Sequence, residues 1–501
     1  MASSTHQTEG QARVAIIGTG LAGLTTAHLL HNDERKRYSV TLFEQSNNLS
    51  FDSASVAVKD GKTGAIERVD LPMRASAGGY YANLMRMYEY LEIPLHPIRF
   101  LFVFAKALPA NSSSSLSGGS EPGTYFVHAS NLHQTPPPWP GKRGVVAHIV
   151  EILYLIVCHF WFSVACFLVQ PRTTAGSGCE GFGESFDEYS RRIWLPRRYI
   201  THYLLPLMSS VSTCSHDQLL AFPASDVVNY KRLSHGEQHY AVCGGVNQVQ
   251  LRLAGGIEDV RLNAQVIQAM PLSDQPAGGV EIRWRSVTDG SVSEEKFDRV
   301  ILAVSPDVAS RIFRPLASRL SVIPTIQVES SVLSATTGKG TARHSVIETD
   351  EPTSNQCMHH GKSISSAQVI ALRSRFSEKG SESEALHTMP SGVVVSTCPL
   401  DGDLGLNNRV LHSAKFTRTI RSTESQALIN SIMNRPSTSH KADDEGQPEQ
   451  WTNGQDNVWL VGAWCWDGMV LLEGCIVSAM RVAGDFGVNI PWQAPDEHKS
   501  R

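Results

Sequence analysis

A glycine-rich turn between an apolar strand and an apolar helix constrains the fold of this chain most. Residues 13–30 begin with a short run rich in β-branched side chains, pass through Gly18, Gly20 and Gly23 in G-x-G-x-x-G spacing, and end in a helix-like stretch. Backbone N–H groups at a helix N-terminus can approach a pyrophosphate only where side chains are absent. The pattern therefore predicts the first strand, turn and helix of a dinucleotide-binding sheet.

A second apolar run, residues 39–44, ends in an acidic side chain. Glu44 follows Gly23 by 21 positions, where a carboxylate can accept hydrogen bonds from the ribose of an adenosine. A phosphate on the 2′ position of that ribose would face the carboxylate, so Glu44 disfavours a 2′-phosphorylated nucleotide but does not separate FAD from NAD. The alternative is an ordinary βαβ turn with Glu44 as a solvated strand end.

The C-terminal part of the chain reads as a strand, a loop and a helix. Within residues 457–483 the strand ends at Gly462, the loop carries Trp464 and Trp466, and the helix begins at Glu473 and Gly474. Together with the N-terminal glycines, this segment resembles the flavin-containing amine oxidase and FAD-dependent desaturase superfamily. Further blocks resemble the superfamily in the same order: Asp70–Arg74, Gly78–Leu84, Val242–Val249, Val260–Val266 and Phe297–Pro306.

The resemblance implies an FAD cofactor and a role for each block. The residues that would hold FAD are Gly18, Gly20, Gly23 and Glu44 at the ADP half, Val266 at the adenine, and Gly462, Glu473 and Gly474 at the flavin end. Aromatic side chains that would hold the substrate beside the flavin are Tyr80, Tyr81, Trp464 and Trp466. Packing of a domain interface is the alternative role for these aromatic residues.

The sequence departs from the superfamily directly after Glu44. Many members have a G-G-R turn there that wraps the pyrophosphate, whereas residues 45–56 contain neither glycine nor arginine. Ser50, Ser53 or Arg74 would then have to donate the hydrogen bonds. The missing turn is also the main support for a rival interpretation, a degenerate member without catalytic activity.

The order of these blocks predicts an α/β fold with two domains. A discontinuous Rossmann-type FAD-binding domain is expected from residues 13–90, 236–310 and 452–490. An α+β substrate domain that carries a long apolar helix is expected from residues 91–235 and 311–451. Residues 1–12 are expected to be disordered. The segments 110–123 and 435–450, rich in Ser, Pro, Gly or charge, are expected to be exposed loops.

One apolar segment is long enough to be a transmembrane candidate. Residues 152–169 form an 18-residue run without a formal charge, inside an expected helix over 149–170. A single crossing would put the N-terminal and C-terminal blocks on opposite sides of a bilayer, although both must meet one FAD. The segment therefore predicts either a helix that dips into one leaflet or a buried helix of the substrate domain. Either placement of this helix favours a lipophilic substrate.

Composition argues against several other classes of protein and of binding site. A net charge of −4 gives nucleic-acid binding no electrostatic basis. Nine scattered cysteines without a C-x-x-C pair indicate neither a zinc ribbon nor a disulfide framework, and they favour a reducing, intracellular compartment. His235 and His239 are four positions apart, but Gly236 between them disfavours a helix, so no metal site is predicted.

The sequence as a whole predicts an FAD-dependent oxidoreductase. Its expected reaction removes a hydride from a small, lipophilic organic substrate, either by oxidising an amine or by introducing a C=C bond. The expected location is the cytoplasm or the surface of an intracellular membrane, with residues 149–170 as the contact. The alternative is a flavin-binding, membrane-associated protein without catalytic activity.

Overall fold

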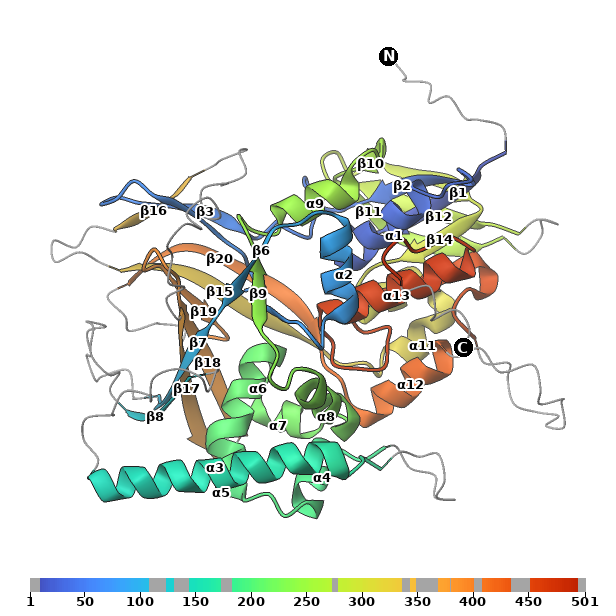
Figure 1. Cartoon of the computed structure of the whole chain (residues 1–501). Helices are drawn as coiled ribbons and strands as arrows, with labels where there is room; N and C mark the ends of the chain where they lie inside the picture. The colour runs from blue at the N-terminus through green and yellow to red at the C-terminus, as the bar shows by residue number, and fades with distance from the viewer. Residues whose placement is uncertain are drawn as a thin grey trace, which may run out of the picture.

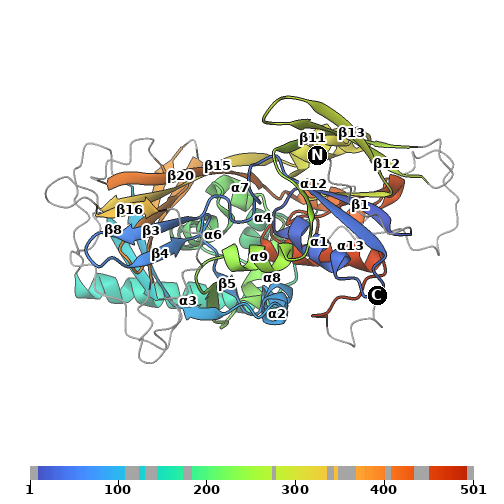
Figure 2. The ribbon, with the colours of Figure 1, turned by 90° about the horizontal axis from the view of Figure 1, so that it is seen from above.

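The structure is a computed structural model, which describes residues 10–107, 123–129, 144–172, 183–272, 278–335, 343–347, 368–378, 380–400, 408–433 and 451–493. Two lobes lie side by side, one built on a parallel sheet and the other on a mixed sheet (Figure 1, Figure 2). The predicted α/β fold class is confirmed. Residues 1–9, the segment 435–450 and all but the last position of 110–123 lie outside the described ranges.

The parallel sheet contains five strands in the order β10-β2-β1-β14-β21. These strands are β1 (Ala12–Ile17), β2 (Tyr38–Phe43), β10 (Asp259–Arg261), β14 (Arg299–Leu302) and β21 (Val458–Leu460). β1 is central, and its last residue, Ile17, lies level with Phe43 of β2 and Leu302 of β14. The carboxyl ends of these strands therefore share one edge, which is where open parallel sheets bind their ligands.

Both faces of β1 are covered, so its side chains are apolar in both directions. Val14 and Ile16 pack in one core cluster with the helices α1 (Leu21–His31), α9 (Asn247–Ala254) and α13 (Leu472–Asp485). Ala15 and Ile17 face the opposite way, into a second cluster. That cluster includes α10 (Pro306–Ile312) and an antiparallel sheet of β11 (Ala264–Pro271), β12 (Val280–Ser286) and β13 (Val292–Phe297). An uninterrupted apolar strand is the expected sequence for this position.

The second lobe is built on a seven-stranded mixed sheet in the order β20-β15-β19-β18-β17-β7-β8. The strands are β7 (Phe100–Lys106), β8 (Thr124–Ala129), β15 (Thr325–Ala335), β17 (Gln368–Ser377), β18 (Gly380–Thr388), β19 (Val394–Thr397) and β20 (Asn408–Thr419). β7 and β17 run parallel, and the other neighbours are antiparallel. We call this half the substrate lobe, after the substrate domain expected from the sequence.

Two three-stranded sheets complete the β structure of the described residues. One pairs β16 (His344–Ile347) with β3 (Val56–Asp60), which in turn pairs with β4 (Ile66–Val69). The other places β9 (His239–Val242) between β5 (Ser76–Ala77) and β6 (Leu95–Ile98). Further helices of the first lobe and its borders are α2 (Ala82–Tyr90), α11 (Ala317–Leu320) and α12 (Thr423–Met433), with 3₁₀ turns at Arg314–Leu316 and Gln455–Asn457.

A helical layer lies between the mixed sheet and the long helix α3 (Val145–Leu168), which runs along one edge of the molecule (Figure 1). The layer comprises a π-helical turn (Ile200–Leu204), α6 (Leu205–Ser212), α7 (His216–Leu220) and α8 (Ala224–Leu233), whereas α4 (Phe186–Arg192) and α5 (Arg197–Tyr199) lie beside α3 (Figure 1). In the described part of the chain, α3 is the one helix long and apolar enough to cross a bilayer, and two thirds of its most apolar stretch is not buried.

One cysteine differs from the sequence-based expectation. Cys243 is disulfide-bonded. The free thiols of the described residues are Cys158, Cys166, Cys214, Cys398, Cys465 and Cys475. Spacing along the chain reports nothing about which cysteines meet in the fold. The cysteine spacing indicated no disulfide framework, and it did not predict the bond at Cys243.

Candidate functional site

The glycine turn leaves an open helix N-terminus at the carboxyl edge of the parallel sheet. Gly18 has φ +101°, and a Cβ there would lie 2.5 Å from the carbonyl oxygen of Ala303. A Cβ on Gly23 would lie 2.1 Å from the carbonyl oxygen of Gly18. Gly20 is the N-cap of α1, and no atom of the described residues lies within 4 Å of where its Cβ would be. The fold thus requires two of the glycines, while the third faces open space.

That open space fits the pyrophosphate of a dinucleotide. Gly20 has no side chain to cap α1, and the first N–H groups of a helix have no partner inside it. These N–H groups and the helix dipole favour an anion at this position. The residues that would hold the ADP half of the cofactor are therefore in place at Gly18, Gly20 and Gly23.

Glu44 follows β2 at the same edge and is buried. Its Oε2 accepts hydrogen bonds from the backbone N–H and the hydroxyl of Thr19, at 3.2 and 2.6 Å, and its Oε1 accepts from the N–H of Ser46 at 3.0 Å. A carboxylate oxygen has room for a second donor, so ribose hydroxyls can still bind. The sequence had not singled out Thr19, because the middle residue of such a turn carries no pattern.

The segment after Glu44 replaces only part of the hydrogen-bond donors that the missing G-G-R turn would supply. The N–H of Ser50 donates to the Thr19 hydroxyl oxygen at 2.9 Å, which brings Ser50 to the glycine turn. The hydroxyl of Ser53 donates to the Ser50 carbonyl at 3.1 Å. Arg74 donates to the Phe51 carbonyl at 3.1 Å and lies 4.5 Å from the centre of the Phe51 ring. Arg74 therefore reaches this segment, and its guanidinium makes no ion pair with a described residue.

Val266 lies on β11, next to the end of β2. The N–H of Ala264 donates to the carbonyl of Glu44 at 2.8 Å, and the N–H of Asn263 donates to the carbonyl of Ser46 at 2.9 Å. The pairing of β11 with β12 is irregular directly after Val266. The structure thus brings Val266 and Glu44, far apart in the sequence, to one edge.

The C-terminal block, residues 457–483, reaches the same edge of the parallel sheet through α13. Glu473 is buried, and its carboxylate accepts from both nitrogens of Asn83 at 3.0 and 2.7 Å and from the N–H of Leu84 at 3.0 Å. Burial raises the pKa of this carboxyl, and the three donors oppose that effect. Glu473 therefore caps the N-terminus of α2 and fixes α13 against it.

The two tryptophans of the C-terminal loop have different surroundings. A Cβ on Gly474 would lie 2.4 Å from Nε1 of Trp466, so this indole rests on the first turn of α13. Trp464 is buried in the second core cluster, where its Nε1 donates to the carbonyl of Val304 at 3.0 Å. A Cβ on Gly462 would lie 2.9 Å from Nε1 of Trp464. Of the two, Trp466 faces the junction between the lobes.

Trp466 belongs to an aromatic cluster with Tyr80, Tyr81 and Tyr230. The Tyr80 ring lies 5.2 Å from Tyr81, 4.8 Å from Tyr230 and 6.0 Å from Trp466, with edge-to-face geometry in each pair. Burial raises the pKa of Tyr80 and Tyr81 well above the usual value for tyrosine. Their hydroxyls therefore stay protonated. The sequence missed Tyr230, which lies in α8 without a recognisable motif.

A buried ion pair, also missed from the sequence, holds the loop that carries Trp466. Arg421 is 2% exposed, and its Nη2 donates to the carbonyls of Trp466 at 2.8 Å and Gly468 at 3.0 Å. Its Nε lies 3.8 Å from Oδ2 of the buried Asp226. Burial raises the pKa of Asp226 to about 6, and the charge of Arg421 opposes that shift.

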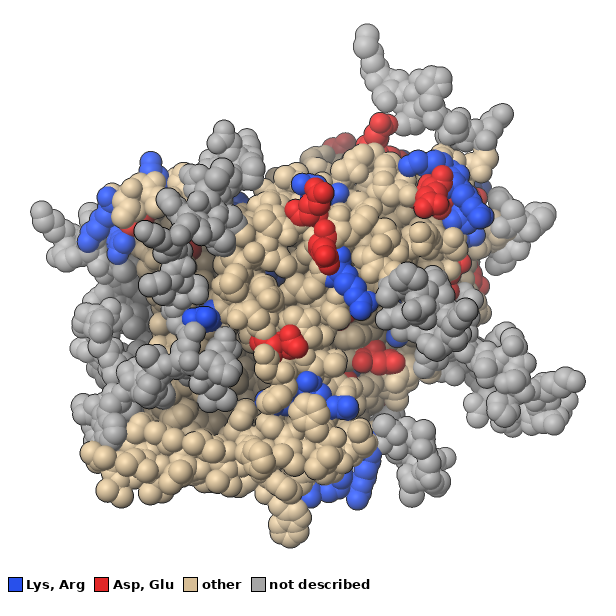
Figure 3. Space-filling model, viewed as in Figure 1, with Lys and Arg blue, Asp and Glu red and all other residues tan. Residues whose placement is uncertain are grey.

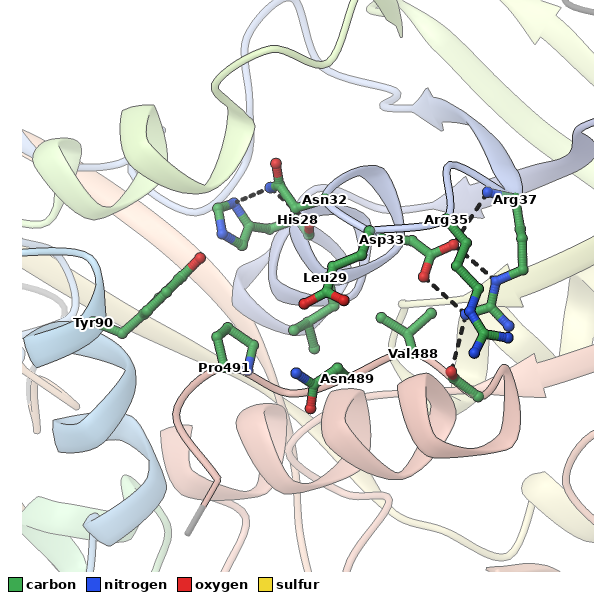
Figure 4. Close-up of a pocket in the computed structure, with 12 residues that line it drawn as sticks. His28, Leu29, Asn32, Asp33, Arg35, Arg37, Tyr90, Val488, Asn489 and Pro491 are labelled. Carbon is green, nitrogen blue, oxygen red and sulfur yellow. Dashed lines mark hydrogen bonds and ion pairs between the residues drawn. The ribbon is translucent and has the colours of Figure 1, made fainter. Parts of the chain in front are cut away.

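A surface pocket of about 470 Å³ lies elsewhere, at the C-terminal end of α1 (Figure 4). Its lining includes His28, Tyr90 and Arg37, whose guanidinium forms an ion pair with Asp33 at 2.8 Å. Arg37 directly precedes β2, so this pocket is at the amino edge of the parallel sheet. Dinucleotides bind at the carboxyl edge, so the glycine turn is the better candidate site.

Comparison with known proteins supports this placement. Residues 16–91 match the family model described as an NAD(P)-binding Rossmann-like domain. Comparison with curated protein sequences gives no match.

Two solved structures share the fold over nearly the whole chain. One is the CLA-producing fatty acid isomerase from P. acnes, with 11% identity, a TM-score of 0.53, and coverage of 96% of this chain and 100% of that one. The other is the cyclohexylamine oxidase from Brevibacterium oxydans IH-35A, with 11% identity, a TM-score of 0.52, and coverage of 95% and 100%.

The chain is thus a two-lobed protein with an NAD(P)/FAD-binding Rossmann-like domain. More particularly, its parallel sheet and the mixed sheet of its second lobe share the fold of these two solved structures, and the α/β fold expected from the resemblance is confirmed. At 11% identity the two neighbours support the fold and not a substrate.

Proposed function

We propose that this protein is an FAD-dependent oxidoreductase that removes a hydride from a small, lipophilic organic substrate. The observation that carries the proposal is the open N-terminus of α1 at Gly20, with Glu44 beside it at the carboxyl edge of the parallel sheet. Bound FAD would supply the acceptor for the hydride. The products would be an imine or carbonyl from an amine, or a C=C bond.

The residues at the junction of the lobes suit an apolar substrate. The aromatic cluster offers ring faces, and the hydroxyls of Tyr80 and Tyr81 stay protonated as donors. Glu473 and Arg421 fix the helix and the loop from which Trp466 projects. These side chains exclude water and orient the substrate. Direct hydride transfer requires no strong base for that step, so an aromatic site suffices.

The second candidate is a flavin-binding protein without catalytic activity. It is favoured by the segment after Glu44, where Arg74 is bound to the Phe51 carbonyl and ring instead of extending into a glycine-rich turn. The visible spectrum of the purified protein distinguishes the candidates, before and after acid precipitation and with dithionite added to a second aliquot. We expect released flavin that dithionite reduces. A colourless protein that cannot be reconstituted with FAD would favour partner binding over catalysis.

We further propose that α3 lies in the surface of an intracellular membrane. Its buried stripe consists of His148, Glu151, Leu155, Cys158, Phe162, Ala165 and Cys166, at helical spacing. The rest of the helix exposes large apolar side chains: Val145, Val146, Ile149, Val150, Leu153, Ile156, Val157, Phe160, Trp161, Phe167 and Leu168. Exposed apolar patches of this extent are typical of membrane or protein contacts.

Charge around α3 favours a lipid surface over a protein partner. The edge of the molecule along α3 is nearly free of charged side chains (Figure 3). Glu151, the one Asp or Glu in the helix, is buried and bound to Arg198. His159 lies on the exposed face, and its Nδ1 is 3.2 Å from the hydroxyl oxygen of Tyr199. Beyond this apolar edge, Trp194 is 87% exposed and Arg191 is well exposed. Tryptophan and arginine are common at the lipid–water interface.

A double substitution on α3 tests the membrane contact. Val157→Asp with Phe160→Asp places two charges on the exposed face, and we expect it to reduce co-sedimentation with phosphatidylcholine vesicles by about 10-fold or more. The matched control is Val287→Asp with Val292→Asp, two exposed valines of the other lobe, which should bind as the native chain does. Equal binding by both double variants, or a native chain that ignores vesicles, would contradict the proposal.

A further inference from the structure

One arginine on the inner face of the substrate lobe lacks a counter-charge among the described residues. On β20 the side chains of Phe416 and Arg418 share one face, because every second residue of a strand points the same way, and Ile420 follows directly after the strand. Ile420 is buried in the first core cluster, and Ile326, which pairs with Arg418 across β15, packs against that cluster. Lys415 and Thr417, on the opposite face, are exposed. Arg418 therefore points inward.

No acidic side chain of the described residues forms an ion pair with Arg418. Its electrostatic neighbours are Tyr81, Cys214, Cys398 and Arg74, of which Arg74 is itself a cation. Within the part of the chain that the structure describes, no side-chain hydrogen bond or ion pair holds its guanidinium. Burial lowers the pKa of this arginine, but a guanidinium in a protein stays charged. Arg418 is only partly exposed, so its charge is incompletely solvated and a bound anion would stabilise it.

The position of Arg418 links it to the proposed site. Three residues further on, Arg421 binds the carbonyl of Trp466, so the end of β20 lies against the loop beside α13. Tyr81 belongs to the aromatic cluster. Cys214 and Cys398 come from the substrate lobe, whereas the pyrophosphate position is at Gly20 on the other lobe. Arg74 is its neighbour from the nucleotide-binding lobe, so Arg418 lies between the lobes, on a strand of the substrate lobe.

We propose that Arg418 binds a carboxylate of the substrate, whose apolar chain lies against the aromatic cluster. A guanidinium can hold a carboxylate through two parallel hydrogen bonds, which fixes both position and orientation. The substrate class is then an amphipathic acid with a long apolar chain. This inference rests on the proposed function, because it orients a substrate at the same site.

The test compares three ligands of equal chain length, dodecanoate, dodecylamine and 1-dodecanol, by titrating tryptophan fluorescence of the full chain. The native chain should bind dodecanoate most tightly. Arg418→Met should weaken dodecanoate binding about 10- to 100-fold, the range for a charged hydrogen bond, and leave 1-dodecanol binding unchanged. The affinity of Arg418→Lys for dodecanoate should fall between those of the native chain and Arg418→Met. The matched control is Lys415→Met, which removes an exposed cation from the other face of the same strand and should bind dodecanoate normally.

Retained 1-dodecanol binding shows that Arg418→Met is folded, so its loss of dodecanoate affinity can be assigned to the missing charge. The inference is overturned if Arg418→Met binds dodecanoate as the native chain does, or if the native chain prefers the amine. It is also overturned if Arg418→Met loses FAD while Lys415→Met keeps it, because Arg418 would then serve the cofactor. Native protein that binds dodecanoate selectively but never holds FAD would overturn the proposed oxidoreductase function alone.

Discussion

The Gly20→Glu variant is expected to fold and to purify without flavin. A Cβ on Gly20 would have no atom of the described residues within 4 Å, so the fold can accept a side chain there. A glutamate would direct its carboxylate into the space at the N-terminus of α1, where the pyrophosphate is expected, and the two anions would repel. The measurement is the ratio of flavin to protein absorbance after reconstitution with excess FAD, with circular dichroism to check folding.

Two neighbouring substitutions act as controls for Gly20→Glu. Gly20→Ala adds a methyl group in open space and should keep most of the FAD. Gly23→Ala places its Cβ 2.1 Å from the Gly18 carbonyl oxygen, so it should destabilise the fold itself. A Gly20→Glu protein with a full complement of FAD would show that the pyrophosphate binds elsewhere.

Arg421→Met is expected to cause the largest loss of stability. The substitution leaves Asp226 buried without its cation and removes the donor to the carbonyls of Trp466 and Gly468. Breaking a buried ion pair by deleting one partner typically costs about 3–5 kcal/mol. Urea unfolding at pH 7 measures the change, and the fluorescence of Trp466 should report release of its loop.

The pH dependence of Arg421→Met follows from Asp226. The folded pKa of this carboxyl is already raised to about 6, and loss of the arginine raises it further. Between the unfolded and folded pKa values the native state holds the extra proton, so stability falls as pH rises through that window. The penalty of Arg421→Met should therefore be smaller at pH 5 than at pH 7. Adding Asp226→Asn should recover part of the loss at pH 7, and a penalty that grows on acidification would contradict this assignment.

Local sequence patterns predicted those parts of the protein whose structure depends on neighbouring residues in the chain. The turn at Gly18, Gly20 and Gly23 is such a case, because the strand, the φ of Gly18 and the start of α1 all depend on adjacent residues. The long apolar helix was also expected, although its pattern did not decide between burial and exposure. α3 buries one stripe and exposes the rest.

The partners of single side chains could not be predicted in the same way. Glu473 binds Asn83, which is 390 positions away, and Arg421 meets Asp226 next to the point where Gln426 of α12 donates to the same carboxylate at 2.9 Å. Trp464 and Trp466 differ by two positions, yet one is in a core and the other rests on Gly474. Turn geometry and long-range packing decide these contacts, and neither leaves a signal in residue spacing.

The order of strands in the parallel sheet has a consequence for how this protein is made. β21 and α13 leave the ribosome after the other four strands of this sheet and after α1, yet β21 forms the sheet edge beside β14 and α13 covers α1. Until they emerge, apolar residues of α1 such as Leu24 and Leu30 lack part of their cover. Contacts between such distant segments form slowly and leave apolar surface open to aggregation. The nascent chain therefore needs protection until α13 docks on α1, and only then does the first core cluster become complete.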